Sequence, residues 1–234
     1  VFHDVSEKRA LAQQLSWQAS HDPLTGLVNR REFERRLEGL LEDARATGRH
    51  HALLFLDLDQ FKVVNDTAGH AAGDELLRQL PRALREHLRS QDLLARLGGD
   101  EFALLLEDAD LAAASRVAEK ARAAVENYRF LWQGHPFQVG ASIGVALVEP
   151  DGHDVAEILS AADVAAYTAK DLGRNRVHVW QPHDDAIRQR QGEMHILTVL
   201  SEALNGDRFL LESQPIRHFR GEGPQRHEEL LVRL

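Results

Sequence analysis

Cysteine is absent from the 234-residue chain, and no apolar run approaches the roughly 18 residues that a membrane-spanning helix needs. The chain therefore has no disulfide, thiolate metal ligand or cysteine nucleophile, which fits a reducing compartment. Basic residues are also scarce, with 28 Lys and Arg against 37 Asp and Glu and a net charge of -9. Because nucleic acid polymers are held by basic patches, this charge argues against a nucleic-acid groove. We expect a cytoplasmic segment without membrane contact of its own.

The composition is that of a soluble globular protein, with 43% hydrophobic and 28% charged residues. The length suits one large domain with flanking pieces. Residues 1–9 carry charges where the apolar core of a signal peptide would lie. Because the chain starts with Val1 rather than Met, we expect an excerpt of a longer protein, and membrane attachment of that parent stays open.

Two glycines followed by two acids separate two apolar runs, at residues 93–97 and 102–106. Gly98 and Gly99 allow the positive φ that tight hairpin turns require, and Asp100 and Glu101 stand where the turn ends. An ordinary solvated turn is the plain alternative, but a turn built only for folding rarely needs adjacent acids. The pattern predicts a β-hairpin with chemistry at its tip.

A second pair of acids, Asp57 and Asp59, follows the apolar run at residues 53–56. Strand alternation places both carboxylates on the same side of the strand end. Magnesium prefers oxygen ligands and usually takes one or two carboxylates together with substrate phosphates, so Asp57 with Asp100 would suffice. An Asp-x-Asp pair after a strand is also common as a cap or loop acid. We expect a metal site where the strand end meets the hairpin.

Apolar residues recur at helical spacing in several segments, which predicts helices at residues 5–19, 29–46, 73–89, 111–127 and 155–172. Shorter apolar runs predict strands at residues 51–58, 93–97, 102–106, 137–148 and 176–180. Strands and helices alternate, and one hairpin interrupts them. This order predicts an α/β (α+β) fold, in which helices cover a mixed central sheet.

Three segments together resemble one family. Residues 96–102, Arg-Leu-Gly-Gly-Asp-Glu-Phe, resemble the signature of the GGDEF family, the diguanylate cyclases. Residues 61–74 resemble the substrate loop of that family, and residues 162–175 resemble its final motif. The resemblance covers residues 20–181. It implies a sheet of about five strands with helices on both faces, like that of nucleotidyl cyclases and the polymerase palm.

The resemblance implies an enzyme that condenses two GTP into cyclic di-GMP and two diphosphates. Such a domain acts as a homodimer and uses Mg²⁺, with Mn²⁺ as an alternative. By the same resemblance the metal ligands are Asp57, the carbonyl of Leu58, and Asp100, and Glu101 is a second acid near the reacting hydroxyl. Which acid takes the proton stays open.

Further roles follow from the resemblance for residues that have plainer explanations alone. Asn65 and Asp74 would read the guanine edge, although loop and N-cap chemistry also explains them. A cation near a helix end, such as Lys170, is favoured by the helix dipole without any ligand. The residues implied in phosphate neutralisation and substrate binding are Lys62, Asn65, His70, Asp74, Gly98, Gly99, Lys170 and Arg174.

Arg89 and Asp92 lie at the spacing before the glycines at which the family carries an Arg-x-x-Asp inhibitory site for its product. Arginine pairs with phosphate or guanine, and aspartate accepts from guanine. A surface salt bridge is the alternative. The resemblance implies feedback inhibition by cyclic di-GMP, with Arg122 as a further ligand.

The two ends of the chain resemble other modules. Residues 4–7 resemble the junction after a PAS sensor domain, so we interpret residues 1–19 as a linker or signalling helix. Residues 182–234 resemble a linker helix, at 193–204, and the opening of an EAL phosphodiesterase domain, at 208–216 and 229–233. An EAL domain is a (β/α)8-type barrel of about 250 residues, so this part is incomplete. Glu229 would be a metal ligand in the parent.

The resemblance also allows a domain without catalysis. In that alternative the chain binds GTP or cyclic di-GMP and regulates the phosphodiesterase that it precedes. The intact motif residues favour the enzyme, but motif integrity does not measure rate.

Overall fold

The computed structural model describes residues 17–150, 154–182, 184, 210–216 and 227–233. The chain divides into two compact units, Val1–Asp185 and Ala186–Leu234. In the second unit, β8 (Leu210–Ile216) pairs antiparallel with β9 (His227–Arg233), which places Glu229 opposite Gln214. Within the described part of the chain, no helix combines the length and apolarity needed to cross a membrane.

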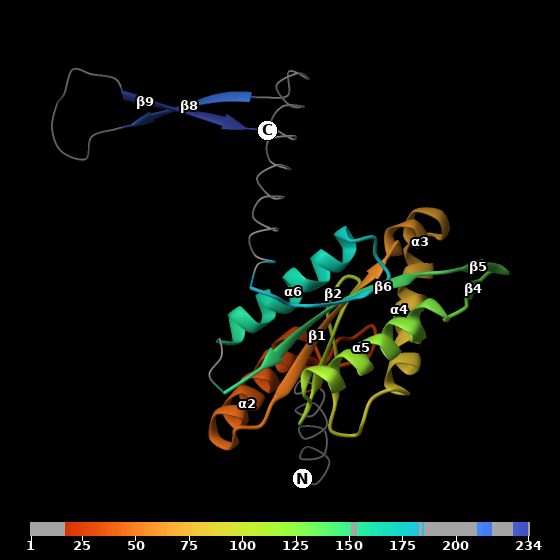
Figure 1. Ribbon diagram of the computed structural model, residues 1–234. Helices are drawn as coiled ribbons and strands as arrows, with labels where there is room; N and C mark the ends of the chain where they lie inside the picture. The colour runs from red at the N-terminus through yellow and green to blue at the C-terminus, as the bar shows by residue number, and fades with distance from the viewer. Residues whose placement is uncertain (1–16, 151–153, 183, 185–209, 217–226, 234) are drawn as a thin grey trace, which may run out of the picture. The chain divides into compact units, whose positions relative to one another are not determined.

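The first unit is built on a five-stranded mixed sheet, as the sequence predicts. Its strands lie in the order β2 (Leu93–Gly98), β3 (Glu101–Leu106), β1 (His51–Asp59), β6 (Gly140–Val148) and β7 (Val177–Val179). The central strand β1 pairs antiparallel with both β3 and β6, and β7 runs parallel to β6 (Figure 1).

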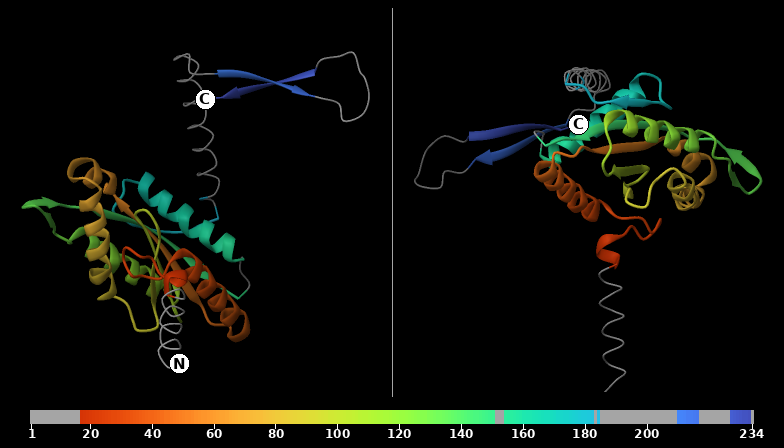
Figure 2. Two further views of the ribbon diagram at one scale, coloured as in Figure 1. Left: turned by 180° about the vertical axis from the view of Figure 1, so that it is seen from behind. Right: turned by 60° about the horizontal axis from the view of Figure 1, so that its bottom comes forward.

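Helices cover both faces of this sheet (Figure 1, Figure 2). Leu53 and Phe55 of β1 pack in one core with α2 (Arg30–Thr47) and α6 (Val155–Asp171). The alternate β1 residues Leu54, Leu56 and Leu58 pack in a second core on the other face. That core is formed with α3 (Phe61–Ala68), α4 (His70–Arg85) and α5 (Leu111–Glu126).

Short polar side chains start three of these helices. Asn29 accepts from the backbone N–H of Glu32 at the start of α2, and Asp110 accepts from that of Ala113 at the start of α5. Asp154 and Glu157 form a complete capping box on α6. These contacts satisfy backbone donors that a helix start leaves without partners, so the helix starts are encoded locally.

The sequence prediction was wrong in five local details. Residues 61–68, expected as a loop, form α3, and α4 begins at His70 rather than residue 73 because Gly69, with φ of 82°, separates the two helices. Helix α4 also ends at Arg85 rather than residue 89. A small hairpin, β4 (Phe130–Trp132) and β5 (His135–Phe137), was missed, and β6 therefore begins at Gly140 rather than residue 137. Of the helix expected at 5–19, residues 17–19 are helical and the rest lies outside the described residues, as does the whole helix expected at 193–204.

Gly144 of β6 lets α6 approach the sheet closely. A Cβ atom at this position would overlap the carbonyl oxygen of Ala162 and the amide nitrogen of Ala166. Both are backbone atoms within α6, so they could yield only if the helix moved. Gly144 therefore fixes how closely α6 packs on the strands beneath it.

We expect Gly144→Ala to lower the free energy of unfolding by about 3 kcal/mol or more, because overpacking against backbone forces the helix to shift. Gly39→Ala is the matched control. A Cβ at Gly39, within α2, meets nothing within 4 Å, so this change should stabilise the domain by about 0.5–1 kcal/mol. Denaturant unfolding measures both, and equal effects of the two variants would contradict the close packing.

Candidate active site

The hairpin between β2 and β3 ends in a turn that Arg96 holds. Gly98 and Gly99 have φ of 151° and 50°, and the strand register shifts between Arg96 and Gly98. The Arg96 guanidinium donates to the carbonyl of Gly99, at 2.7 Å from Nη2, and to both carboxylate oxygens of Asp22, at 3.1 Å. Positive φ at the two glycines lets the chain turn tightly.

Asp22 therefore belongs to the framework of the site, a role that no local sequence pattern predicts, because its partner Arg96 lies far along the chain. Burial raises the pKa of Asp22, but hydrogen bonds from Thr25 and Arg96 outweigh that effect and leave the pKa below its usual value. The ionised carboxylate anchors Arg96, and Arg96 in turn anchors the hairpin tip.

Three acids meet where the hairpin tip joins the end of β1. The backbone N–H of Leu58 donates to the carbonyl of Asp100 at 3.3 Å. Asp57 and Glu101 are direct partners in the antiparallel pairing of β1 with β3. The predicted convergence of Asp57, Asp100 and Glu101 at one edge of the sheet is thus what the strand pairing produces.

Asp57 forms an ion pair with Lys170, near the end of α6, with 2.6 Å between Oδ2 and Nζ. Burial raises the pKa of Asp57. The Lys170 ammonium opposes this rise, and the carboxylates of Asp100 and Asp59 add to it. Asp57 is therefore an anion held in a partly buried and strongly negative setting.

Glu101 has the same kind of surroundings with a weaker counter-charge. Burial raises the pKa of Glu101, and the neighbouring carboxylates of Asp57, Asp163 and Asp100 raise it further. Arg30 opposes the rise from 3.4 Å, between Nη2 and Oε2. Arg30 and Asp163 had no assigned role at the sequence level, because each comes from a helix whose position over the hairpin only the fold defines.

Asp59 serves the framework of the site. Its side chain is buried, accepts from Ser142 Oγ at 2.8 Å, and accepts from the backbone N–H of Asn175 at 2.9 Å. Asp59 thereby joins β1 to β6 and to the loop after α6. The alternation that groups Asp57 with Asp59 does not distinguish the acid open to a ligand from the acid used in structure.

The donor set at this edge fits a magnesium ion that is shared with a nucleotide. No group of three or more His, Asp or Glu side chains suited to a metal occurs among the residues that the structure describes. Magnesium needs only one or two carboxylates when substrate phosphates complete its shell. Asp57, Asp100 and the Leu58 carbonyl supply that number of oxygens, and the mutual repulsion of the carboxylates favours a cation there.

Four of the residues implied in nucleotide binding lie in α3 and the first turns of α4, directly after β1. Asn65 is half-buried, and a Cβ at Gly73 would overlap its Oδ1, so glycine allows this contact between the helices. Asp74 follows Gly73 and is exposed, as are Lys62 and His70. The fold thus brings Asn65 beside Asp74. Arg174 comes directly after the turn that ends α6, the helix on the other face of the sheet. It is exposed, and its backbone is left-handed with φ of 63°.

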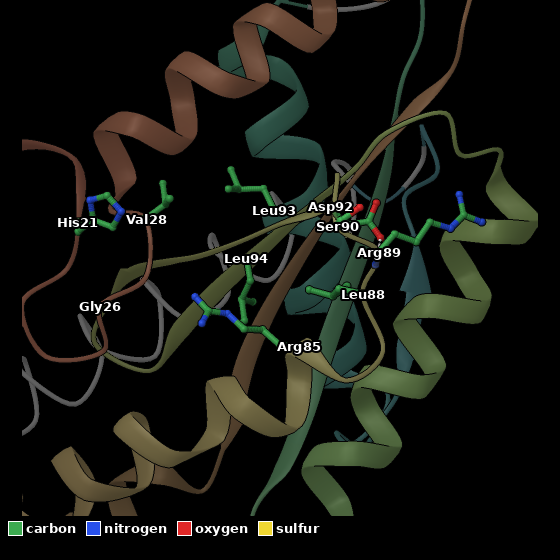
Figure 3. Close-up of a pocket in the computed structure, with 10 residues that line it drawn as sticks. All are labelled: His21, Gly26, Val28, Arg85, Leu88, Arg89, Ser90, Asp92, Leu93 and Leu94. Atoms are coloured by element: carbon green, nitrogen blue, oxygen red, sulfur yellow. Dashed lines mark hydrogen bonds between the residues drawn. The ribbon is translucent and has the colours of Figure 1, made fainter. Parts of the chain in front are cut away.

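Arg89 and Asp92 lie together in the loop between α4 and β2. The Asp92 carboxylate accepts from the backbone N–H of Arg89 at 2.8 Å. Both line a cavity of about 390 Å³ whose wall also includes His21 and Arg85, and in Figure 3 the Arg89 side chain extends toward α5. Both also line a second cavity of about 310 Å³, together with Arg116 and Lys120 of α5. Exposed arginines beside an open cavity suit an anionic ligand.

Arg122, which the resemblance groups with Arg89, has other partners. Its guanidinium donates to Glu119, Glu126 and Asn175, at 2.6–3.1 Å. Arg122 lines neither of the two cavities beside Arg89. The cations of α5 that line a cavity together with Arg89 are Arg116 and Lys120. Which side of α5 faces the α4–β2 loop depends on how the helix packs, so the sequence alone does not identify them.

Comparison with known proteins shows the family of the chain. Residues 19–176 match the family model described as "Diguanylate cyclase, GGDEF domain". The chain is 48% identical over 196 residues to the probable diguanylate cyclase DgcE of Escherichia coli K12, which covers 84% of this chain and 18% of that protein. It is 33% identical over all 234 residues to the cyclic di-GMP phosphodiesterase PdeB of Shewanella oneidensis, 27% of whose length is covered.

Among solved structures, the coiled coil and GGDEF domain of DgcB from Caulobacter crescentus, crystallised with c-di-GMP, superposes with a TM-score of 0.71. That likeness, at 29% identity, covers 76% of this chain and 94% of the DgcB chain. The chain belongs to the GGDEF family of diguanylate cyclase domains. It spans 18% of the length of DgcE and 27% of the length of PdeB.

Glu101→Gln tests the electrostatic strain in the site. In the folded domain the pKa of Glu101 is raised above its ordinary value of 4.5. Ionisation of Glu101 therefore lowers the stability of the wild type as the pH rises above that value. The variant should therefore be more stable than the wild type at about pH 7.5. The difference should disappear below about pH 4.5.

Thermal unfolding over this pH range checks the expectation. Glu107→Gln, at an exposed position directly after β3, is the control and should stay within about 0.5 kcal/mol of the wild type. A Glu101→Gln domain that is less stable than the wild type at neutral pH would contradict the burial and repulsion described for this carboxylate.

Proposed function

We propose that this domain is an active diguanylate cyclase, which joins two GTP molecules into cyclic di-GMP and releases two diphosphates. The observation that carries the proposal is the meeting of Asp57, Asp100 and Glu101 with Lys170 at one edge of the sheet. Membership of the GGDEF family supports it. Since each domain holds one GTP, two copies must face one another, and the active unit is a homodimer.

The chain's own residues position the nucleotide in this reaction. Asp74 accepts hydrogen bonds from the guanine edge, and Asn65 accepts from it or donates to it, with His70 nearby. Gly98 and Gly99 let the backbone approach the nucleotide closely. Residues with positive charge hold the phosphates: Lys62, Lys170 and Arg174.

Asp57, Asp100 and the carbonyl of Leu58 hold the divalent cation, which we propose is Mg²⁺ with Mn²⁺ as a substitute. When bound, it reduces the charge repulsion against the 3′-hydroxyl and stabilises the leaving diphosphate. The 3′-oxygen bonds to the α-phosphorus of the opposing GTP, and the bond to the diphosphate breaks. We propose that Glu101 accepts the hydroxyl proton, because it is the acid of this edge that the proposed metal ligands leave over.

Asp100→Asn should lower the rate of cyclic di-GMP formation by at least about a hundredfold, because a neutral amide cannot replace a carboxylate ligand of magnesium. The measurement incubates the purified chain with GTP and Mg²⁺ and quantifies cyclic di-GMP by chromatography. Asp108→Asn makes the same substitution two residues after the other end of β3, where a left-handed φ of 46° also suits Asn. Its rate should equal that of the wild type, and full turnover by Asp100→Asn would refute the metal assignment.

Arg89, Asp92 and a cation of α5 form the proposed inhibitory site for cyclic di-GMP. Arg89→Ala should abolish product inhibition while leaving the initial rate unchanged, because it removes the bidentate donor. The α5 cation is tested by comparing Lys120→Ala with Arg122→Ala in the same titration of product. Loss of inhibition in Arg122→Ala alone would identify Arg122 as the ligand, as the resemblance implies. Loss in Lys120→Ala alone would identify Lys120, which lines the cavity beside Arg89. Unchanged inhibition in Arg89→Ala would refute the site.

The parent protein is the subject of a second proposal. We propose that residues 1–19 link the domain to a PAS-type sensor and that residues 182–234 open an EAL domain, with Glu229 as a metal ligand there. The identity to PdeB, which extends over the whole chain, supports the second part. It also favours the alternative of a GTP- or cyclic di-GMP-binding module that regulates a phosphodiesterase. In that alternative the chain binds nucleotide in the assay above but forms no cyclic di-GMP.

A further inference from the structure

The positive charge beside Asp57 is already supplied from within the chain. Lys170 Nζ lies 2.6 Å from Asp57 Oδ2, and the side chains keep only 32% and 13% of their exposure. Partly buried pairs are screened less by salt than surface pairs. Asp100 and Asp59 add negative charge around Asp57. Lys170 is therefore the ammonium that balances this acidic edge when no other cation is there.

The backbone of Lys170 is fixed, whereas its ammonium can move. Lys170 lies in the last turn of α6, whose distance from the sheet is set by Gly144 and whose start is held by a capping box. The ammonium is carried on a flexible four-carbon stem. The side chain can therefore leave Asp57 without any change in the helix, and the carboxylate that it leaves is one of the proposed metal ligands.

We propose that Lys170 is a resident counter-cation, which a divalent metal must displace from Asp57, and that the nucleotide phosphates draw Lys170 away. The inference rests on the proposed function, which sends Lys170 to the phosphates. A metal ion and an ammonium disfavour one another at Asp57, because their charges repel at such short range. Metal and nucleotide then bind cooperatively, since each favours the state with Lys170 released.

The consequence is a specificity device for the metal–nucleotide complex. Without nucleotide, Lys170 competes with the metal, so the domain binds divalent ions weakly. With nucleotide, the competitor becomes a phosphate ligand. The acidic edge would otherwise bind divalent cations by themselves, and with Lys170 present it binds them together with the substrate.

The test measures Mn²⁺ binding to the 234-residue chain in the absence of nucleotide, from the electron paramagnetic resonance signal of free Mn²⁺. Lys170→Met should bind Mn²⁺ about tenfold more tightly than the wild type, because it removes the competing charge and keeps the stem. Arg174→Met is the matched control, since it removes a cation four positions further on, at an exposed site. Arg174→Met should leave Mn²⁺ affinity unchanged, although both variants should weaken binding of GTP.

The double variant Lys170→Met with Asp57→Asn should lose the gain, which ties the bound Mn²⁺ to this carboxylate. Equal affinity of the wild type and Lys170→Met would overturn the inference, and so would a gain that persists without Asp57. Circular dichroism checks folding, and Lys170→Gln serves as a second variant with a polar end. If the wild type forms cyclic di-GMP but Lys170→Met binds Mn²⁺ no better, only this inference fails. If the gain is seen but no product forms, only the proposed function fails.

Discussion

The burial of β1 on both faces is the constraint on which the site depends. This strand is paired on both sides, and its side chains alternate between the α2–α6 core and the core formed by α3, α4 and α5. A polar residue at the end of β1 must therefore face one of two filled layers. Asp57 continues the row of Leu53 and Phe55, on the side of α6, where Lys170 comes from. The apolar packing thus decides which carboxylate is paired with which cation.

The acidic edge is a place where the fold carries charge repulsion that packing elsewhere stabilises. Burial and neighbouring carboxylates raise the pKa of both Asp57 and Glu101, so ionising them opposes folding at neutral pH. Arg30 and Lys170 offset part of this cost, and the Arg96 contacts hold the tip in place despite it. A domain that only had to fold would be more stable with neutral side chains here. Such strain at neutral pH is characteristic of sites that bind a cation or transfer a proton.

The sequence predicted the parts of this arrangement that local patterns encode. The GGDEF hairpin, the strand before Asp57 and the helices that start at polar caps each have a signal within a few residues, and the order of strands and helices predicted the mixed sheet. Helix α3 was missed because residues 61–74 were interpreted by resemblance as a substrate loop, whereas packing of Val64 into the core stabilises a short helix. Propensity is a weak guide when tertiary contacts decide the conformation.

The contacts between distant residues could not be predicted in the same way. Strand alternation makes Asp57 and Asp59 equivalent, and only the positions of Ser142 and Asn175 show that Asp59 is used in structure. Likewise, helical spacing puts Lys120 and Arg122 on different sides of α5, but the side that faces Arg89 depends on how α5 docks on the sheet. The pairing of Lys170 with Asp57 joins residues more than a hundred positions apart through the approach that Gly144 permits. The site is thus specified by packing as much as by its motif, and Lys170 gains its position beside Asp57 from a glycine on β6 that lets α6 approach the sheet.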